Sequence, residues 1–86
     1  MIVNAAIRFN GKIYTGKRHA WIMNEIRKEF PDAHYPNPDD QGFVNEKGQY
    51  LRRPPALIEA IKYGQVEPGK TFQPHELFSE DIWKDS

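Results

Sequence analysis

The sequence contains no cysteine, so it has neither a disulfide framework nor a thiolate zinc site. It also has no apolar run near the ~18 residues that a membrane-spanning helix needs, and its N-terminus lacks a signal-peptide pattern. The net charge is zero, whereas a broad nucleic-acid binder is usually basic overall. These absences predict a cytoplasmic protein whose partners include neither a membrane nor bulk nucleic acid.

Length and charge distribution set further bounds. The 86 residues are predicted to form a single domain, 1–86. A chain of this size buries only about 60–65% of its unfolded surface, so its own core is modest. Residues 1–31 carry six Lys/Arg and two Asp/Glu, a charge of +4, and residues 32–86 carry six and ten, a charge of −4. This mild asymmetry favours a small anion that is held locally.

Two hairpins are predicted from the alternation of apolar and polar residues. Residues 2–9 alternate along one strand, and Asn10-Gly11 is the strongest short signal for a hairpin turn. The return strand, residues 12–15, is expected to direct Ile13 inward. A second hairpin is predicted over residues 42–51.

Each predicted hairpin is followed by a predicted helix. Apolar residues at spacings of four indicate an amphipathic helix over residues 18–30, with Trp21 widening its apolar stripe. Pro54 and Pro55 open a second helix, and Gly64 ends it. The fold class is therefore α+β: a small antiparallel sheet of two hairpins with two helices packed on one face.

The remaining segments are less regular. Residues 31–41 hold three prolines and form a long loop, of the kind that is often functional or mobile. Residues 71–73 are a candidate short strand. Ser79 is predicted to cap a short terminal helix with Glu80 and Asp81 in its first turn, which favours a structural role for these carboxylates over acid–base catalysis.

Cationic side chains stand at the predicted start of both helices. Lys17, Arg18 and His19 precede the first helix, and Arg52 and Arg53 precede the second. Cations at this end of a helix are disfavoured by about 0.3–1 kcal/mol each, because it is the positive pole of the helix dipole. Free N–H groups and guanidinium groups bind phosphate, so the placement indicates an anion site where the two junctions converge. The alternative is a set of solvated surface cations.

Aromatic residues lie close to these cations in the sequence. Phe43 and Tyr50 are candidates for stacking on a base, which together with phosphate contact is the general chemistry of nucleotide recognition. The alternative is ordinary packing, because aromatic residues on strands commonly belong to the core or to cross-strand pairs.

Catalytic and metal-binding patterns are lacking. His19, His34 and His75 are isolated, with no H-E-x-x-H motif, and there is no P-loop, Rossmann fingerprint or nucleophile elbow. A phosphodiesterase or nuclease would rest only on His19, His34 and the acidic tail. The sequence therefore predicts a binding protein rather than an enzyme, with no cofactor and no metal.

Three segments together form a composite pattern. "YTGKRH", "QGFVNEKGQYLRRPPALIEAIKYGQV" and "LFSEDIW" contain a G-x-R-H segment, a Q-G-F…G-Q segment and an S-E-D-[LI]-[WY] ending. In this the chain resembles a recurrent type of small bacteriophage protein, and its layout is similar to that of the first-type anti-Thoeris sponges. It differs from those proteins at Pro54 and Pro55, where they usually carry acidic residues.

The resemblance implies a homo-oligomeric, non-catalytic trap for a nucleotide-derived small molecule, a cyclic ADP-ribose signal. It implies that Arg18 and His19 meet the phosphates, that Phe43 stacks on a base or shapes the pocket, and that Arg53 completes the clamp. The aromatic bulk of Trp21, Phe78 and Trp83 also indicates a homo-oligomer, with subunit contact through the terminal segment.

A function of a different class stays open. The chain could instead inhibit a host enzyme or defence effector by direct protein contact. Tyr35 in the proline-rich loop and the terminal Trp83 would then be the contact residues, because aromatic side chains anchor protein interfaces.

Overall fold

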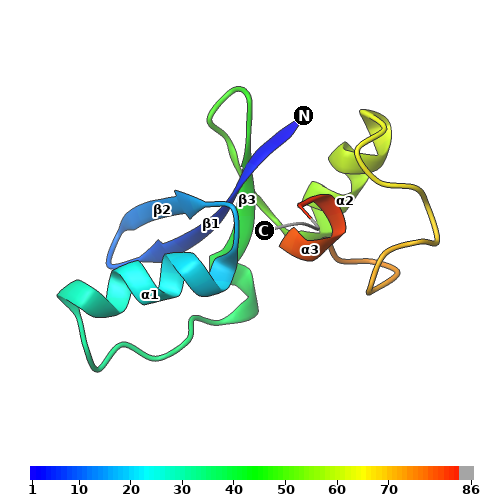
Figure 1. Cartoon of the computed structure of the whole chain (residues 1–86). Helices are drawn as coiled ribbons and strands as arrows, with labels where there is room; N and C mark the ends of the chain where they lie inside the picture. Colours follow the sequence, from blue (N-terminus) through cyan, green and yellow to red (C-terminus); the bar gives the residue numbers. More distant parts are fainter. Residues whose placement is uncertain (84–86) are drawn as a thin grey trace.

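A computed structural model of the chain describes residues 1–83. Two strands, a helix, a short 3₁₀ turn, two further strands and two more helices follow one another along the chain (Figure 1). The elements are β1 (Ile2–Phe9), β2 (Lys12–Gly16), α1 (His19–Glu29), η1 (Pro38–Asp40), β3 (Gln41–Asn45), β4 (Tyr50–Arg52), α2 (Arg53–Lys62) and α3 (Ser79–Ile82).

The four strands form one antiparallel sheet in the order β2-β1-β3-β4. The two predicted hairpins therefore lie side by side, and β1 and β3 are the central strands. One face of the sheet is covered by α1, which lies over β1 and β2, and by α2, which lies near β3 and β4. This confirms the predicted α+β architecture.

The turns follow from the sequence. Asn10 and Gly11 both have positive φ angles, 51° and 75°, as a type I′ turn requires, and Gly48 has φ 75° in the second hairpin. The inward face of β2 was predicted wrongly, however. Ile13 pairs with Arg8 on the outer face and is 48% exposed, whereas Tyr14 packs against the core.

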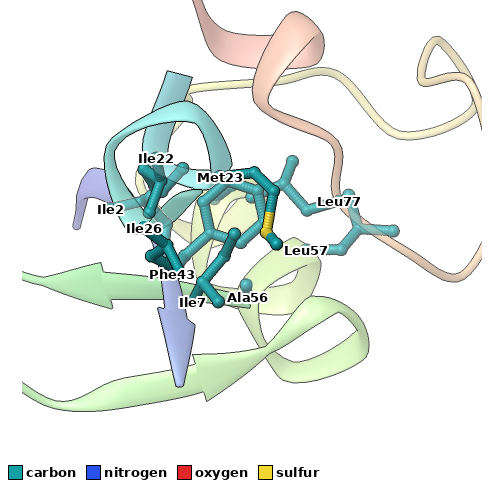
Figure 2. Packing of buried hydrophobic residues seen from close by; sticks show 11 residues of the cluster. Ile2, Ile7, Ile22, Met23, Ile26, Phe43, Ala56, Leu57 and Leu77 are labelled. Carbon is teal, nitrogen blue, oxygen red and sulfur yellow. The ribbon is translucent and has the colours of Figure 1, made fainter. Parts of the chain in front are cut away.

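The core lies between the sheet and the two helices (Figure 2). Phe43 at its centre is completely buried, and Leu77 from the C-terminal segment closes one side. Trp21 does not join this core, since half of its side chain is exposed. The cluster consists of Ile2, Ala5, Ile7, Ile22, Met23, Ile26, Phe43, Ala56, Leu57, Ala60 and Leu77.

The C-terminal segment differs from the prediction in two respects. Residues 71–73 form bends rather than a strand. Phe78, and not Ser79, occupies the N-cap position of α3. The capping group is the carboxylate of Asp81, which accepts hydrogen bonds from the backbone N–H groups of Phe78 (2.9 Å) and Phe72 (3.1 Å). One buried carboxylate thus fixes both α3 and the preceding loop.

Candidate functional site

The starts of α1 and α2 converge on neighbouring residues of β3. His19 Nε2, at the start of α1, donates to the carbonyl oxygen of Gly42 at 2.8 Å. Arg53 Nη2, at the start of α2, donates to Gln41 Oε1 at 3.0 Å. We call this region the helix-start site, comprising Lys17, Arg18, His19, Arg53 and the segment 77–83 that lies against them.

Arg53 fastens the C-terminal segment to the sheet. Its Nη1 donates to the carbonyl oxygen of Leu77 at 2.8 Å, and the Leu77 N–H donates back to the Arg53 carbonyl oxygen at 3.2 Å. The guanidinium carbon lies 4.3 Å from the ring centroid of Phe78, a cation–π contact. Only 8% of the residue is exposed, and burial lowers the pKa of the guanidinium from its usual value. Arg53 therefore joins the C-terminal segment to β3 and also supplies positive charge.

His19 is held neutral by its surroundings. Burial, followed by the nearby charge of Arg53, lowers the pKa of His19 from 6.5 to about 4, although the bond to Gly42 and the carboxylate of Glu80 act in the opposite direction. Its ring packs edge-on against Phe43, with centroids 5.1 Å apart. At neutral pH it therefore supplies a fixed N–H donor and no net charge.

Acid is expected to destabilise the protein through His19. Unfolded chains take up the His19 proton near pH 6.5, whereas the folded protein takes it up only near pH 4. Stability must therefore fall as pH decreases through this window, because the unfolded state binds more protons. The expected loss in unfolding free energy between pH 7 and pH 5 is about 2 kcal/mol. Urea denaturation at several pH values measures it.

The His19→Gln variant is the direct comparison, since glutamine keeps an N–H donor and does not titrate. Its unfolding free energy is expected to vary much less between pH 7 and pH 5 than that of the wild type. His34→Gln and His75→Gln serve as controls, because both of those histidines are exposed. If the unfolding free energy of His19→Gln falls between pH 7 and pH 5 as much as that of the wild type, His19 is not the cause of the pH dependence.

Lys17 and Arg18 occupy the outer side of the helix-start site. Lys17 is exposed; its Nζ donates to the Val3 carbonyl oxygen at 3.0 Å and lies 4.7 Å from the ring centroid of Trp83. Arg18 is 8% exposed and takes the N-cap position of α1. Trp83 also packs on Phe43, with ring centroids 6.4 Å apart. Lys17 is thus the accessible cation of the cluster.

Backbone donors are distributed unequally between the two helix starts. Among residues 1–83, no side chain makes a hydrogen bond at the N-cap of either helix, and neither helix has an acidic residue in its first turn. In α2, however, Pro54 and Pro55 have no N–H group to offer. The N–H groups suited to an anion are therefore those of α1, while α2 contributes the Arg53 side chain.

Phe43 and the remaining candidates lie in other environments. Phe43 has no exposed surface, so its ring is a core element between His19 and Trp83 and offers no face to a base in this conformation. Tyr50 and Arg52 lie on the opposite face of the sheet from α1 and α2. The structure therefore brings Lys17, Arg18, His19 and Arg53 together, with Phe43 beneath them, and separates the other two.

Tyr50 and Arg52 belong to a second group, the open-face cluster, which holds η1 against the sheet. Asp39 is its centre: its carbonyl oxygen accepts from Tyr50 Oη (3.0 Å) and Arg8 Nη2 (3.0 Å), and its Oδ1 accepts from Arg52 Nη1 (3.3 Å). Arg8 also stacks on the Tyr50 ring at 4.6 Å and pairs with Asp40. Burial raises the pKa of Tyr50. The cluster is defined by Arg8, Asp39, Asp40, Tyr50 and Arg52.

Two residues at or beside the helix-start site were not among the predicted ligand-binding residues. Gln41 positions Arg53, and Trp83 covers Lys17 and Phe43. Trp83 ends the S-E-D-[LI]-[WY] segment, so its sequence signal was present, but it had been assigned to a subunit or protein interface. Gln41 belongs to the Q-G-F segment, so it also had a sequence signal, but that segment pointed to Phe43 as the ligand contact and not to Gln41 as the partner of Arg53.

A hollow lies beside the helix-start site, between the loop after α2 and the start of α3. It has a volume of about 490 Å³ and is lined by Lys70, Thr71, Phe72, Glu80 and Asp81. No group of three or more His, Asp or Glu residues among residues 1–83 is placed to hold a metal ion. None of the helices in this part of the chain combines the length and apolar character needed to cross a bilayer.

Fold and site together define a small α+β domain in which two helices start at one shared cationic centre. The chain belongs to the phage T4 y16D protein family, whose model matches residues 1–83. This confirms the predicted small bacteriophage protein, while the finer resemblance to anti-Thoeris sponges stays a prediction. No match was found among curated proteins or among solved structures.

Proposed function

We propose that this phage protein binds and sequesters a phosphate-bearing nucleotide signal, of the cyclic ADP-ribose or cyclic nucleotide type, without cleaving it. The observation that carries the proposal is the convergence of the two helix starts on Gln41 and Gly42. Lys17, Arg18 and Arg53 and the α1 dipole all contribute positive potential there. A compact anion is the ligand that such a centre favours over an extended one.

Access to the centre implies a movement of the C-terminal segment. Arg53 and His19 are each less than a tenth exposed: Arg53 donates to the Leu77 carbonyl oxygen, and His19 packs on the Phe43 ring, which Trp83 also contacts. Lys17 therefore makes the first contact with a phosphate, and deeper contact requires Trp83 to leave the Lys17 ammonium group. The Glu80 carboxylate, whose charge acts on both His19 and Arg53, is the group that an incoming anion would replace.

Binding is tested by thermal shift and calorimetry against ADP-ribose, its cyclic isomers, and cyclic di- and trinucleotides. A ligand at a hundredfold excess over Kd stabilises the folded protein by about 2.7 kcal/mol. The Lys17→Gln variant is expected to weaken binding about 10- to 100-fold, since a charge-assisted hydrogen bond contributes about 1.5–3 kcal/mol. Lys47→Gln removes an equal charge from an exposed turn and should bind normally.

Two further readouts separate a sponge from its alternatives. Ligand recovered intact after denaturation excludes cleavage. In a Trp21→Phe background, Trp83 fluorescence should change on binding, because Trp83 lies against Lys17. Absence of a shift with every compound, or equal affinity in Lys17→Gln and Lys47→Gln, would contradict the proposal.

The second candidate function is inhibition of a host protein by direct contact. It is favoured by large apolar side chains left exposed, namely Tyr35 (50%), Phe72 (69%) and Ile58 (71%). Trp83, the other residue proposed for that interface, is only partly exposed and has contacts within the chain. A stoichiometric complex with a host protein that is lost in Tyr35→Ser, together with no affinity for nucleotides, is the result this function predicts.

A further inference from the structure

The outer edge of β2 has hydrogen-bonding groups directed away from the sheet. Among residues 1–83, β2 pairs with β1 alone, in an unbroken register from Phe9↔Lys12 to Ala5↔Gly16. The two-residue turn makes Phe9 and Lys12 a hydrogen-bonded pair, and such pairs alternate along an antiparallel ladder. The backbone N–H and C=O groups of Ile13 and Thr15 therefore point outward.

This edge lacks the features that usually protect an edge strand. β2 has no proline and no bulge, and Lys12 is its one charged residue. Ile13 adds an apolar side chain that is 48% exposed. By contrast, the Val3 carbonyl oxygen of β1, beyond the end of β2, is covered by Lys17 Nζ, and the opposite edge strand β4 has only three residues. The edge of β2 is thus the part of the sheet suited to pairing.

We propose that β2 pairs with β2 of a second copy of this chain, antiparallel about a two-fold axis at Tyr14. Ile13 then lies opposite Thr15 of the partner subunit, and all the outward backbone groups of the two strands are paired. Tyr14 faces Tyr14 of the partner subunit on the helix side of the sheet, an aromatic cross-strand pair. The two sheets become one continuous eight-stranded sheet.

Charge distinguishes this register from its neighbours. An axis at Tyr14 places Lys12 opposite Gly16 of the partner subunit, so no like charges face each other. An axis at Thr15 would place Lys12 opposite Arg18 of the partner subunit. An axis at Ile13 would leave the Thr15 backbone groups opposite the turn residue Gly11 of the partner subunit. The register at Tyr14 alone pairs every outward group without charge repulsion.

The helices also fit this arrangement. α1 lies over β1 and β2, and the Ile22 side chain lies against Gly16. With strands about 4.8 Å apart, the two copies of α1 would be separated by about 10 Å, which is the distance of packed helices. Successive residues are 100° apart around a helix, and Ile22 faces the sheet at β2. Trp21 and Glu25 therefore lie together on one side of α1, next to the side that carries Ile22. Trp21, 49% exposed, would then be covered by the partner subunit's α1.

Engineered cysteines test the register, because the chain has none of its own. In Tyr14→Cys the two thiols face each other at a non-hydrogen-bonded pair, with Cα atoms about 4.5 Å apart, within disulfide range. In Ile13→Cys the equivalent atoms are about 9 Å apart, beyond that range. We expect mild oxidation to form the covalent dimer at least tenfold faster in Tyr14→Cys, followed by non-reducing electrophoresis.

Exposure alone predicts the opposite order, since Ile13 is more exposed than Tyr14. Faster crosslinking of Ile13→Cys would therefore contradict the proposal. The second measurement is the mass of the wild-type protein in solution by light scattering, expected to be that of a dimer or a multiple of it. Thr15→Pro removes an outward N–H and should halve this mass, whereas Thr15→Val should not. A monomeric wild type, or an unchanged mass in Thr15→Pro, also overturns it; neither outcome depends on nucleotide binding.

Discussion

Replacing Gly42 by alanine is expected to lower the unfolding free energy by about 3 kcal/mol or more. A Cβ atom at this position would stand 2.2 Å from the backbone carbonyl oxygen of Leu51 and 2.8 Å from the ring of Tyr50. Tyr50 could rotate away, but the Leu51 oxygen belongs to the neighbouring strand β4. Relief therefore requires β3 and β4 to separate. A chain of this length has a total stability of about 4–13 kcal/mol, so such a loss removes a large fraction of it.

Gly16→Ala is the matched control for this substitution. Gly16 lies on a strand of the same sheet, and neither glycine has a positive φ angle. Its added Cβ would meet the Ile22 side chain, with Cγ1 at 3.0 Å and Cδ1 at 3.7 Å, and a side chain adjusts more easily than the backbone of a paired strand. The expected loss is under about 1 kcal/mol. Equal denaturation midpoints for the two variants would show that β4 moves more easily than the structure indicates.

Gly42 also shows why part of the fold could not be predicted from the sequence. The strand containing Gly42 was predictable from its apolar neighbours, and the turn at Gly48 from turn chemistry. The need for glycine at 42 was not, because it arises from the Tyr50 ring and a carbonyl group of another strand. Close approach between strands leaves no periodic signal in one sequence.

Strand facing was harder to predict than strand position. β1 alternates clearly, but β2 contains one aliphatic residue, Ile13, and hydrophobicity alone assigned it to the core. The register of the hairpin decides otherwise: Tyr14 pairs with the buried Ile7, and Ile13 pairs with the exposed Arg8. A register count from the Asn10-Gly11 turn gives the correct face, because side chains alternate with a period of two.

The candidate site, too, was predictable from the sequence only in part. Clustering of cations at two helix starts was visible in the sequence, and His19 and Arg53 do meet at β3. Their burial was not foreseen, because it depends on the C-terminal segment, far away in sequence, folding back over them. Tyr50 and Arg52 were grouped with these cations by sequence proximity, yet strand alternation directs them to the opposite face.

Arg53→Met is expected to lower the unfolding free energy by about 2–4 kcal/mol, and Arg52→Met by no more than about 0.5 kcal/mol. The two residues are adjacent and carry the same charge, but their contacts differ. Arg52 makes one exposed ion pair with Asp39 at 3.3 Å. Arg53 holds the Leu77 carbonyl oxygen and Gln41 Oε1 from a buried position, and methionine satisfies neither acceptor.

Two opposing contributions decide the size of the Arg53 effect. Removing a buried guanidinium recovers its desolvation cost, which is why its pKa is lowered, and methionine keeps much of the packing on Phe78. The lost hydrogen bonds outweigh this gain because the Leu77 carbonyl lies in the core region, away from water. Chemical denaturation measures the total, and limited proteolysis of residues 70–78 shows whether the C-terminal segment detaches first. If Arg53→Met keeps its stability and its C-terminal segment resists proteolysis, then burial of Leu77 alone is sufficient to hold that segment in place. The helix-start site would then be free to use Arg53 for a ligand at little structural cost.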